Sequence, residues 1–186
     1  MSKHIECCWG ERVSPIMREY HDKVWGKPCH DDTLLFKMLC LEGFQAGLTW
    51  ELVLKRAESL GAAFEGFDPK RVAAFDNKKA EALLAAPGMI KHRGKIAAVI
   101  NNARCYLDIQ KECGSFNDYI WGFTDGKTVD KHYEKLEDIP AESQLSRLIS
   151  KDLKKRGFKF AGAVIVYSFL QAVGIVNDHL ADCGYR

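Results

Sequence analysis

Residues 83–100 read LLAAPGMIKHRGKIAAVI, and this stretch says more about the fold than any other part of the chain. Apolar residues recur at helical spacing on both sides of Pro87 and Gly88, which are poor helix residues and common in turns. The sequence therefore predicts a helix, a tight turn and a second helix, a helix-hairpin-helix at about residues 78–107.

The second helix of this hairpin has features that favour an anion. Gly94 opens it without a side chain to block an approach, and free amide groups and the helix dipole attract negative charge at a helix start. Lys91, Arg93 and Lys95 add positive charge. A hairpin of this kind can grip a nucleic-acid backbone phosphate without reading sequence. An ordinary connection between two helices is the competing interpretation.

Helical patterns continue through most of the chain, which we expect to be all-α. We treat residues 1–186 as one unit, because no linker, repeat or low-complexity tract divides them. Residues 158–173 are apolar on nearly every side and predict a central core helix, and residues 177–183 predict a short last helix. No alternating run of residues predicts a sheet.

Composition sets limits on function. The chain has 186 residues, is 47% hydrophobic and 28% charged, and carries a formal net charge of +2. Such a balance excludes a disordered or collagen-like protein, and the net charge alone does not indicate a nucleic-acid binder. A basic cluster within residues 147–159 is the other concentration of positive charge. No apolar run approaches the roughly 20 residues of a membrane span, and the start lacks a signal peptide, so we expect a cytoplasmic protein with no membrane contact.

Cysteines and histidines near the two ends suggest a metal site. The seven cysteines are an odd number in a chain without an export signal, so a disulfide framework is not expected. His179 and Cys183 would share one face of a helix, and Cys7, or its neighbour Cys8, lies near His21 at the other end. Four such ligands would form a closed tetrahedral Cys₂His₂ shell for one structural zinc ion. The alternative is a buried cysteine with two surface histidines.

Glu42 continues the apolar stripe of Leu35 and Leu39, so its carboxylate is expected to point inward. Burying it costs several kcal/mol unless it is hydrogen-bonded or paired, and a carboxylate buried in this way often has a function. Small residues next to it leave space, and rings could line that space: Trp9, Tyr20, Trp25 and Trp50. A carboxylate among rings suits a flat, nitrogen-rich, positively charged ligand. Alternatively, Glu42 caps a helix or pairs with a buried lysine.

Several longer motifs occur in an order that resembles one family. They are Cys-x-Trp at 7–9, Tyr-His-Asp at 20–22 with Trp-Gly at 25–26, LEGFQAGLTW at 41–50, HRGKI at 92–96, KRGFKFAG at 155–162 and Asn-Asp-His-x3-Cys at 177–183. From about Cys7 to Cys183 the chain resembles the bacterial 3-methyladenine DNA glycosylase I family of the helix-hairpin-helix glycosylase superfamily.

The resemblance implies an all-α, two-lobed enzyme that cuts the N-glycosidic bond of 3-methyladenine and leaves an abasic site without cutting the strand. Its partners would be double-stranded DNA containing an alkylated purine and free 3-methyladenine as product, and we expect it to act as a monomer. Carried onto this chain, the zinc set falls on Cys7, His21, His179 and Cys183. The base pocket falls on Glu42, Tyr20, Trp50 and Trp9.

The chain departs from the family pattern in two places. One extra residue lies between Trp9 and Pro15, which leaves Cys8 as a rival to Cys7 for the metal. Met17 stands where the family tends to have a pocket tyrosine. No aspartate beyond the hairpin matches the one that other superfamily members use to activate water. Two other function classes compete: a zinc-stapled DNA-binding module without catalysis, and a thiol-dependent enzyme using Cys183 or Cys8.

Overall fold

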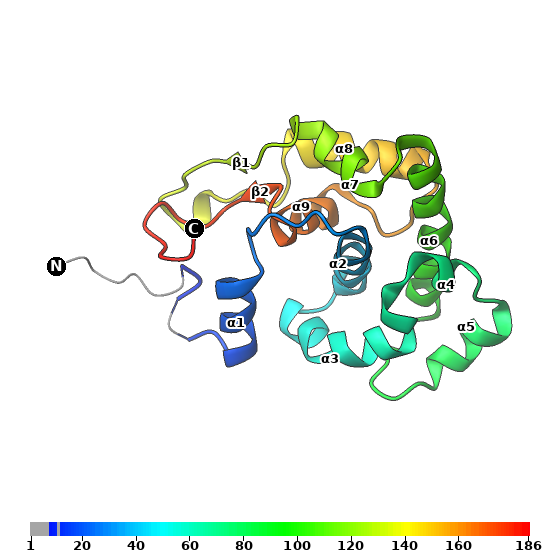
Figure 1. Ribbon diagram of the computed structural model, residues 1–186. Helices are drawn as coiled ribbons and strands as arrows, with labels where there is room; N and C mark the ends of the chain where they lie inside the picture. The colour runs from blue at the N-terminus through cyan, green and yellow to red at the C-terminus, as the bar shows by residue number, and fades with distance from the viewer. Residues whose placement is uncertain (1–7, 11) are drawn as a thin grey trace.

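The computed structural model describes residues 8–10 and 12–186, and this part of the chain is mostly helical (Figure 1). Its helices and strands, in chain order, are α1 (Pro15–Lys23), α2 (Asp32–Gln45), α3 (Trp50–Ala63), η1 (Glu65–Phe67), α4 (Pro69–Ala73), α5 (Asn77–Leu84), α6 (Arg93–Cys113), α7 (Phe116–Trp121), η2 (Gly122–Thr124), β1 (Val129–Asp130), η3 (Leu136–Asp138), α8 (Gln144–Lys155), α9 (Ala163–Ala172) and β2 (Val176–Asn177). No helix in the described ranges is long and apolar enough to cross a membrane.

The core is centred on α2 and α9, which pack against each other in the middle of the molecule (Figure 1). Phe36 of α2 and Phe169 of α9 are fully buried. Each such side chain stabilises the fold by about 1.5–3 kcal/mol relative to an exposed position. Helix α8 packs on α9, while α4 and α5 pack on α6. The helix that carries Glu42 is therefore held in a rigid position.

Several helices begin at short polar residues that can be recognised as caps in the sequence, and these residues do cap them. Asp68 precedes Pro69 and accepts a hydrogen bond from the amide of Lys70 at 2.8 Å. Ser115 caps α7 in the same way, and Ser143 caps α8 through a reciprocal capping box. A short polar side chain satisfies amide groups that have no partner within the helix, which is why these residue types mark the starts.

The predicted core helix over 158–173 is shorter than expected, because α9 begins only at Ala163. Asn102 of α6 holds the preceding segment: its side chain donates to the carbonyl of Lys159 and accepts from the Lys159 amide, both at 2.8 Å. Phe160 then takes a left-handed backbone conformation with φ 52°. These side-chain bonds replace those that a helix would make.

The expectation of a chain without any sheet is also wrong, and so is the last helix. Val129 and Asp130 of β1 pair in parallel with Val176 and Asn177 of β2, and the residues after β2 form turns up to the C-terminus. Two-residue strands are too short to show alternation, and their pairing joins segments far apart in sequence.

The connection from α1 to α2 is fixed against the end of α9. The amide of Gly26 donates to the carbonyl of Gln171 at 2.9 Å, and that of Cys29 donates to Val173 at 3.0 Å. Gly174 has φ +71°, and a Cβ there would lie 2.3 Å from the carbonyl carbon of Lys27. This close approach requires glycine and holds the α1–α2 connection against the end of α9, next to the site.

Candidate functional site

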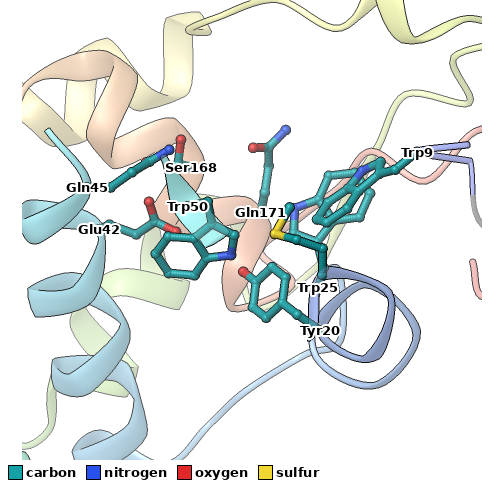
Figure 2. A pocket seen from close by; sticks show the side chains of 9 residues that line it. Trp9, Tyr20, Trp25, Glu42, Gln45, Trp50, Ser168 and Gln171 are labelled. Carbon is teal, nitrogen blue, oxygen red and sulfur yellow. The ribbon is translucent and has the colours of Figure 1, made fainter. Parts of the chain in front are cut away.

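A cavity of about 220 Å³ opens between α1, α2, α3 and α9, and we call it the aromatic pocket (Figure 2). Cavities for drug-sized ligands measure about 300–1,000 Å³, so this one suits a smaller molecule. Its lining residues are Trp9, Met17, Tyr20, Trp25, Glu42, Gln45, Trp50, Ser168 and Gln171. All four pocket residues predicted from the sequence therefore meet in one cavity.

Glu42 lies in the last turn of α2 and is only 3% exposed. Its Oε2 is buried and has no hydrogen-bond partner among the described residues. Burial raises the pKa of Glu42 to about 8. Within residues 8–10 and 12–186, Glu42 neither caps a helix nor pairs with a buried lysine. A buried carboxyl group without a hydrogen-bond partner is available to a ligand that brings its own donors.

The rings form walls around this carboxylate. The Tyr20 and Trp50 rings meet edge to face with centroids 5.2 Å apart, and those of Trp9 and Trp25 lie 4.8 Å apart. The indole N–H of Trp50 is buried without a partner among the described residues. Burial, followed by the negative charge of Glu42, raises the pKa of Tyr20 well above its usual value. The pocket thus offers a free acceptor, a free donor and aromatic faces.

Sequence reasoning missed three polar residues of the lining: Gln45, Ser168 and Gln171. Helical spacing carried a usable signal for each of them. Gln45 lies three residues after Glu42, so it shares that face of α2. Ser168 and Gln171 are spaced by three residues on α9, which is otherwise almost entirely apolar. Polar residues on one face of a core helix indicate a lined cavity.

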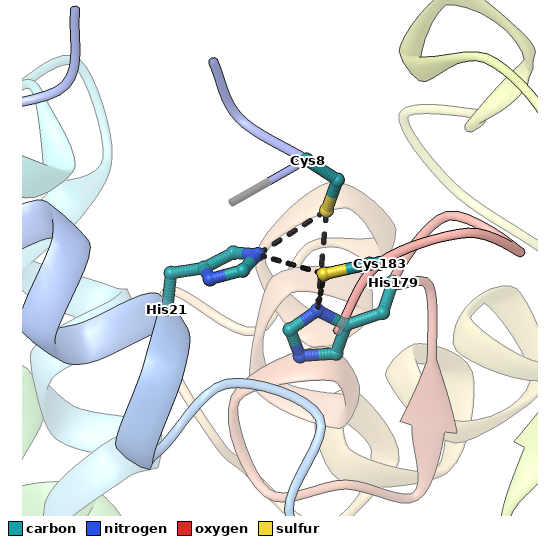
Figure 3. Close-up of side chains that lie close together, drawn as sticks. All are labelled: Cys8, His21, His179 and Cys183. Atoms are coloured by element: carbon teal, nitrogen blue, oxygen red, sulfur yellow. Dashed lines mark hydrogen bonds between the residues drawn. The ribbon is translucent and has the colours of Figure 1, made fainter. Parts of the chain in front are cut away.

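Four buried side chains form a second centre beside the pocket, the Cys–His cluster: Cys8, His21, His179 and Cys183 (Figure 3). The Cys8 sulfur lies 3.2 Å from Nε2 of His21 and 3.9 Å from Nδ1 of His179. The Cys183 sulfur lies 3.7 Å and 3.3 Å from the same two atoms. A tetrahedral zinc ion with ordinary bond lengths separates sulfur and nitrogen ligands by about 3.5 Å, so the donor set and spacing fit zinc.

Both histidines of the cluster are oriented by second hydrogen bonds. Nδ1 of His21 forms a hydrogen bond with Oδ1 of Asp22 at 2.7 Å, and Nε2 of His179 donates to the carbonyl oxygen of Trp25 at 2.9 Å. Burial lowers the pKa of His179 to about 4, which favours the neutral ring that binds metals. Gly26, with φ +74°, leaves room for this ring, because a Cβ would lie 2.8 Å from Cδ2 of His179. Such supporting bonds are typical of metal ligands.

The cluster contains the thiol of Cys8, the rival left open by the sequence, whereas the predicted ligand Cys7 lies outside the described residues. His179 and Cys183 do meet, but across a turn and not on a helix. Cys8 and Cys183 are both buried, which does not favour the thiol-dependent enzyme, because reactive thiols need access to their substrate.

The segment predicted to bind an anion joins α5 to α6 through residues 85–92. Lys91, Arg93 and Gly94 are exposed, and Arg93 pairs with Glu81. The prediction that Lys95 belongs to the anion site is wrong. Its ammonium is buried and donates to the carbonyls of Phe44 and Ala46 at 2.7 and 2.6 Å. It therefore satisfies the C-terminal end of α2 and is not available to a ligand at the surface.

The basic cluster of residues 147–159 is partly neutralised. Arg147 pairs with Glu142 at 2.7 Å. Arg156 contacts Asp152 at 2.7 Å and Glu112 at 2.6 Å. The four lysines of this range are exposed on the surface: Lys151, Lys154, Lys155 and Lys159.

Comparison with known proteins agrees with this geometry. Residues 9–186 match a family model described as methyladenine glycosylase. The chain is 46% identical to the DNA-3-methyladenine glycosylase 1 of Escherichia coli K12 over 179 residues, 96% of both chains. It is 45% identical to a DNA-3-methyladenine glycosylase of Haemophilus influenzae over 178 residues, 95% of both chains.

Solved structures are similar over nearly the whole chain. One is a crystal structure of 3-methyladenine DNA glycosylase I, with a TM-score of 0.91, 46% identity, and coverage of 96% of this chain and 98% of that one. Another, from Staphylococcus aureus, concerns 3-methyladenine recognition, with a TM-score of 0.93, 40% identity, and coverage of 98% and 96%.

Proposed function

The chain belongs to the methyladenine glycosylase family and is a DNA repair glycosylase that excises 3-methyladenine, and we propose that Glu42 in the aromatic pocket recognises the damaged base. One observation carries this proposal: Glu42 is buried among rings, and its Oε2 has no hydrogen-bond partner in the part of the chain that the structure describes. A purine methylated at N3 is cationic while attached to the sugar, so it brings both the charge and the N–H donors that this carboxylate lacks.

The positive charge of the methylated base also promotes its excision. The damaged nucleotide is flipped out of the duplex, at a cost of a few kcal/mol, and stacks against Trp50 and Tyr20. Glu42 accepts its N–H donors, and undamaged adenine, which is neutral, gains less from the carboxylate. The base leaves as a neutral molecule, so the bond breaks through an oxocarbenium-like state with little need of a general acid.

The residues beyond the hairpin support a monofunctional enzyme that leaves an abasic site. The stretch after the hairpin offers Asn101 and Asn102 in place of a water-activating aspartate, and their side chains bond the backbone of Gly157 and Lys159. The buried ammonium of Lys95 is already satisfied by two carbonyls, so it is not a nucleophile for strand cleavage. Departure of the base, which neutralises its positive charge, then supplies most of the driving force.

Contact with double-stranded DNA is assigned to α5, the following connection and α6, acting as the helix-hairpin-helix of a two-lobed fold. Lys91, Arg93 and Gly94 are exposed at the start of a 21-residue helix whose amide groups and dipole favour a phosphate. Contacts of this kind position the duplex without reading its sequence, as a repair enzyme requires. One chain contains both the pocket and the hairpin, so a monomer is sufficient.

The Cys–His cluster is proposed to hold one structural zinc ion. Bound zinc would join the two ends of the chain, since Cys8 and His179 are 171 residues apart in sequence. The four protein ligands leave no open position for a substrate, so the ion takes no part in the reaction.

The test is incubation with methylated double-stranded DNA, followed by chromatography of the released bases. Wild-type enzyme is expected to release 3-methyladenine and to leave strands that break only on later alkali treatment. Glu42→Gln should lose most of this activity, whereas Glu58→Gln, an exposed position on α3, should retain it. Binding of DNA without release of free base would support the non-catalytic module instead, and full activity of Glu42→Gln would remove Glu42 from its assigned role.

A further inference from the structure

Gln171 supplies a polar group to the aromatic pocket from a different helix than Glu42. It lies on α9 and lines the cavity together with Ser168, three residues earlier (Figure 2). Its side-chain Nε2 donates a hydrogen bond to Oδ2 of Asp178 at 2.7 Å. The amide is therefore held at one end by a residue outside the pocket.

Asp178 fixes which end of that amide is free. It is 1% exposed, and the hydroxyl of Tyr167 donates to the same Oδ2 at 2.6 Å. Because Oδ2 accepts both bonds, Gln171 must turn its NH₂ group toward it. The oxygen of the Gln171 amide is the remaining polar atom and is left for the cavity. The bond to Asp178 thus orients the amide so that its oxygen, an acceptor, lies at the end opposite Asp178.

Glu42 and Gln171 together give the pocket two oxygen acceptors on its walls. An adenine-type base has an amino group at position 6 that donates, whereas a guanine-type base has an oxygen there that can only accept. We propose that Gln171 is a specificity-determining residue that selects alkylated purines with a 6-amino group over those with a 6-oxo group. Asp178 is the positioning residue that acts through it. This proposal rests on the proposed function.

The experiment measures, in one reaction on methylated double-stranded DNA, the initial rates at which 3-methyladenine and 3-methylguanine are released. The ratio of the two rates does not depend on the fraction of folded enzyme, so a general structural defect leaves it unchanged. Gln171→Met, which keeps the length but has no acceptor, is expected to lower the ratio about tenfold or more. Asp178→Asn can donate to the Gln171 oxygen and turn its NH₂ group into the pocket, so relative release of 3-methylguanine should rise.

Tyr167→Phe is the matched control, because it removes a hydrogen bond to Asp178 but leaves the bond to Gln171. Its ratio is expected to stay at the wild-type value. A ratio within about twofold of wild type in both Gln171→Met and Asp178→Asn would overturn the inference. A shift in Tyr167→Phe equal to that in Asp178→Asn would overturn the positioning role. A wild-type protein that releases no 3-methyladenine would refute the proposed function itself.

Discussion

Replacing Glu42 by glutamine is expected to remove a large pH dependence from the free energy of unfolding. Burial raises the pKa of Glu42 from 4.5 to about 8 in the folded protein, whereas in the unfolded chain the carboxyl group faces water and keeps its ordinary pKa. Below pH 4.5 both states hold the proton. Between the two values only the folded protein still holds it, so stability falls as pH rises. Above about pH 8 both states are ionised, and the loss is complete.

The size of the effect follows from the difference between the two pKa values. Each pKa unit corresponds to about 1.4 kcal/mol. A shift from 4.5 to about 8 therefore lowers the free energy of unfolding by on the order of 5 kcal/mol above pH 8 and by about 3 kcal/mol at pH 7. A chain of 186 residues changes its melting temperature by about 2–4 °C per kcal/mol, which gives roughly 10 °C at pH 7. Glutamine carries no charge at any pH, so the variant does not lose unfolding free energy in this way as the pH rises.

Urea or thermal unfolding of both proteins between about pH 5 and 9, at equal metal content, tests the reasoning. The difference in unfolding free energy, variant minus wild type, should rise with pH and level off near pH 8. Glu58→Gln, at an exposed position, should show a flat difference. If the Glu42→Gln difference were equally flat, the carboxylate would be solvated or paired in solution and would not be the buried, unpaired acceptor that base recognition requires.

Four further results are expected. Since ionised Glu42 attracts the cationic base, kcat/KM for base release should rise to about pH 8 and then level, and initial rates that do not change with pH in this range would contradict it. Lys91→Ala should weaken DNA binding and reduce its salt dependence by about one counter-ion in titrations at several salt concentrations. Lys95→Met should leave that salt dependence unchanged but lower the unfolding free energy by about 1–3 kcal/mol, because two buried carbonyls lose their donor. Cys8→Ser should lower the zinc content found by metal analysis while Cys7→Ser retains it, and the opposite result would assign the ligand to Cys7.

Local patterns predicted much of the fold and the centre of the site. Glu42 could be placed inside from its spacing to Leu35 and Leu39, because the period of a helix is a property of neighbouring residues. Asp68 and Ser143 marked helix starts for the same reason, since a cap acts within one turn. The same local order allowed the family resemblance to be recognised.

Long-range contacts were beyond the reach of such patterns. Lys95 sits among surface cations in the sequence, yet it is buried because the end of α2, 49 residues away, brings it two carbonyls. Asn102 likewise stops the core helix from across the fold. His179 and Cys183 were expected together on a helix and meet instead across a turn, since pairing of β2 with β1 directs the chain after Asn177.

The Cys–His cluster and the aromatic pocket are parts of one structure. Trp9 directly follows Cys8 and packs on Trp25, whose carbonyl accepts the hydrogen bond of His179. A pocket that keeps a carboxylate unpaired for its ligand gives up stability at that point, and filling the cavity to regain it would remove the function. A zinc ion in the Cys–His cluster would link the two ends of the chain next to Trp9 and Trp25, and would stabilise these rings without occupying the cavity. The position of the cluster, next to the rings and not among them, is the one that this compromise requires.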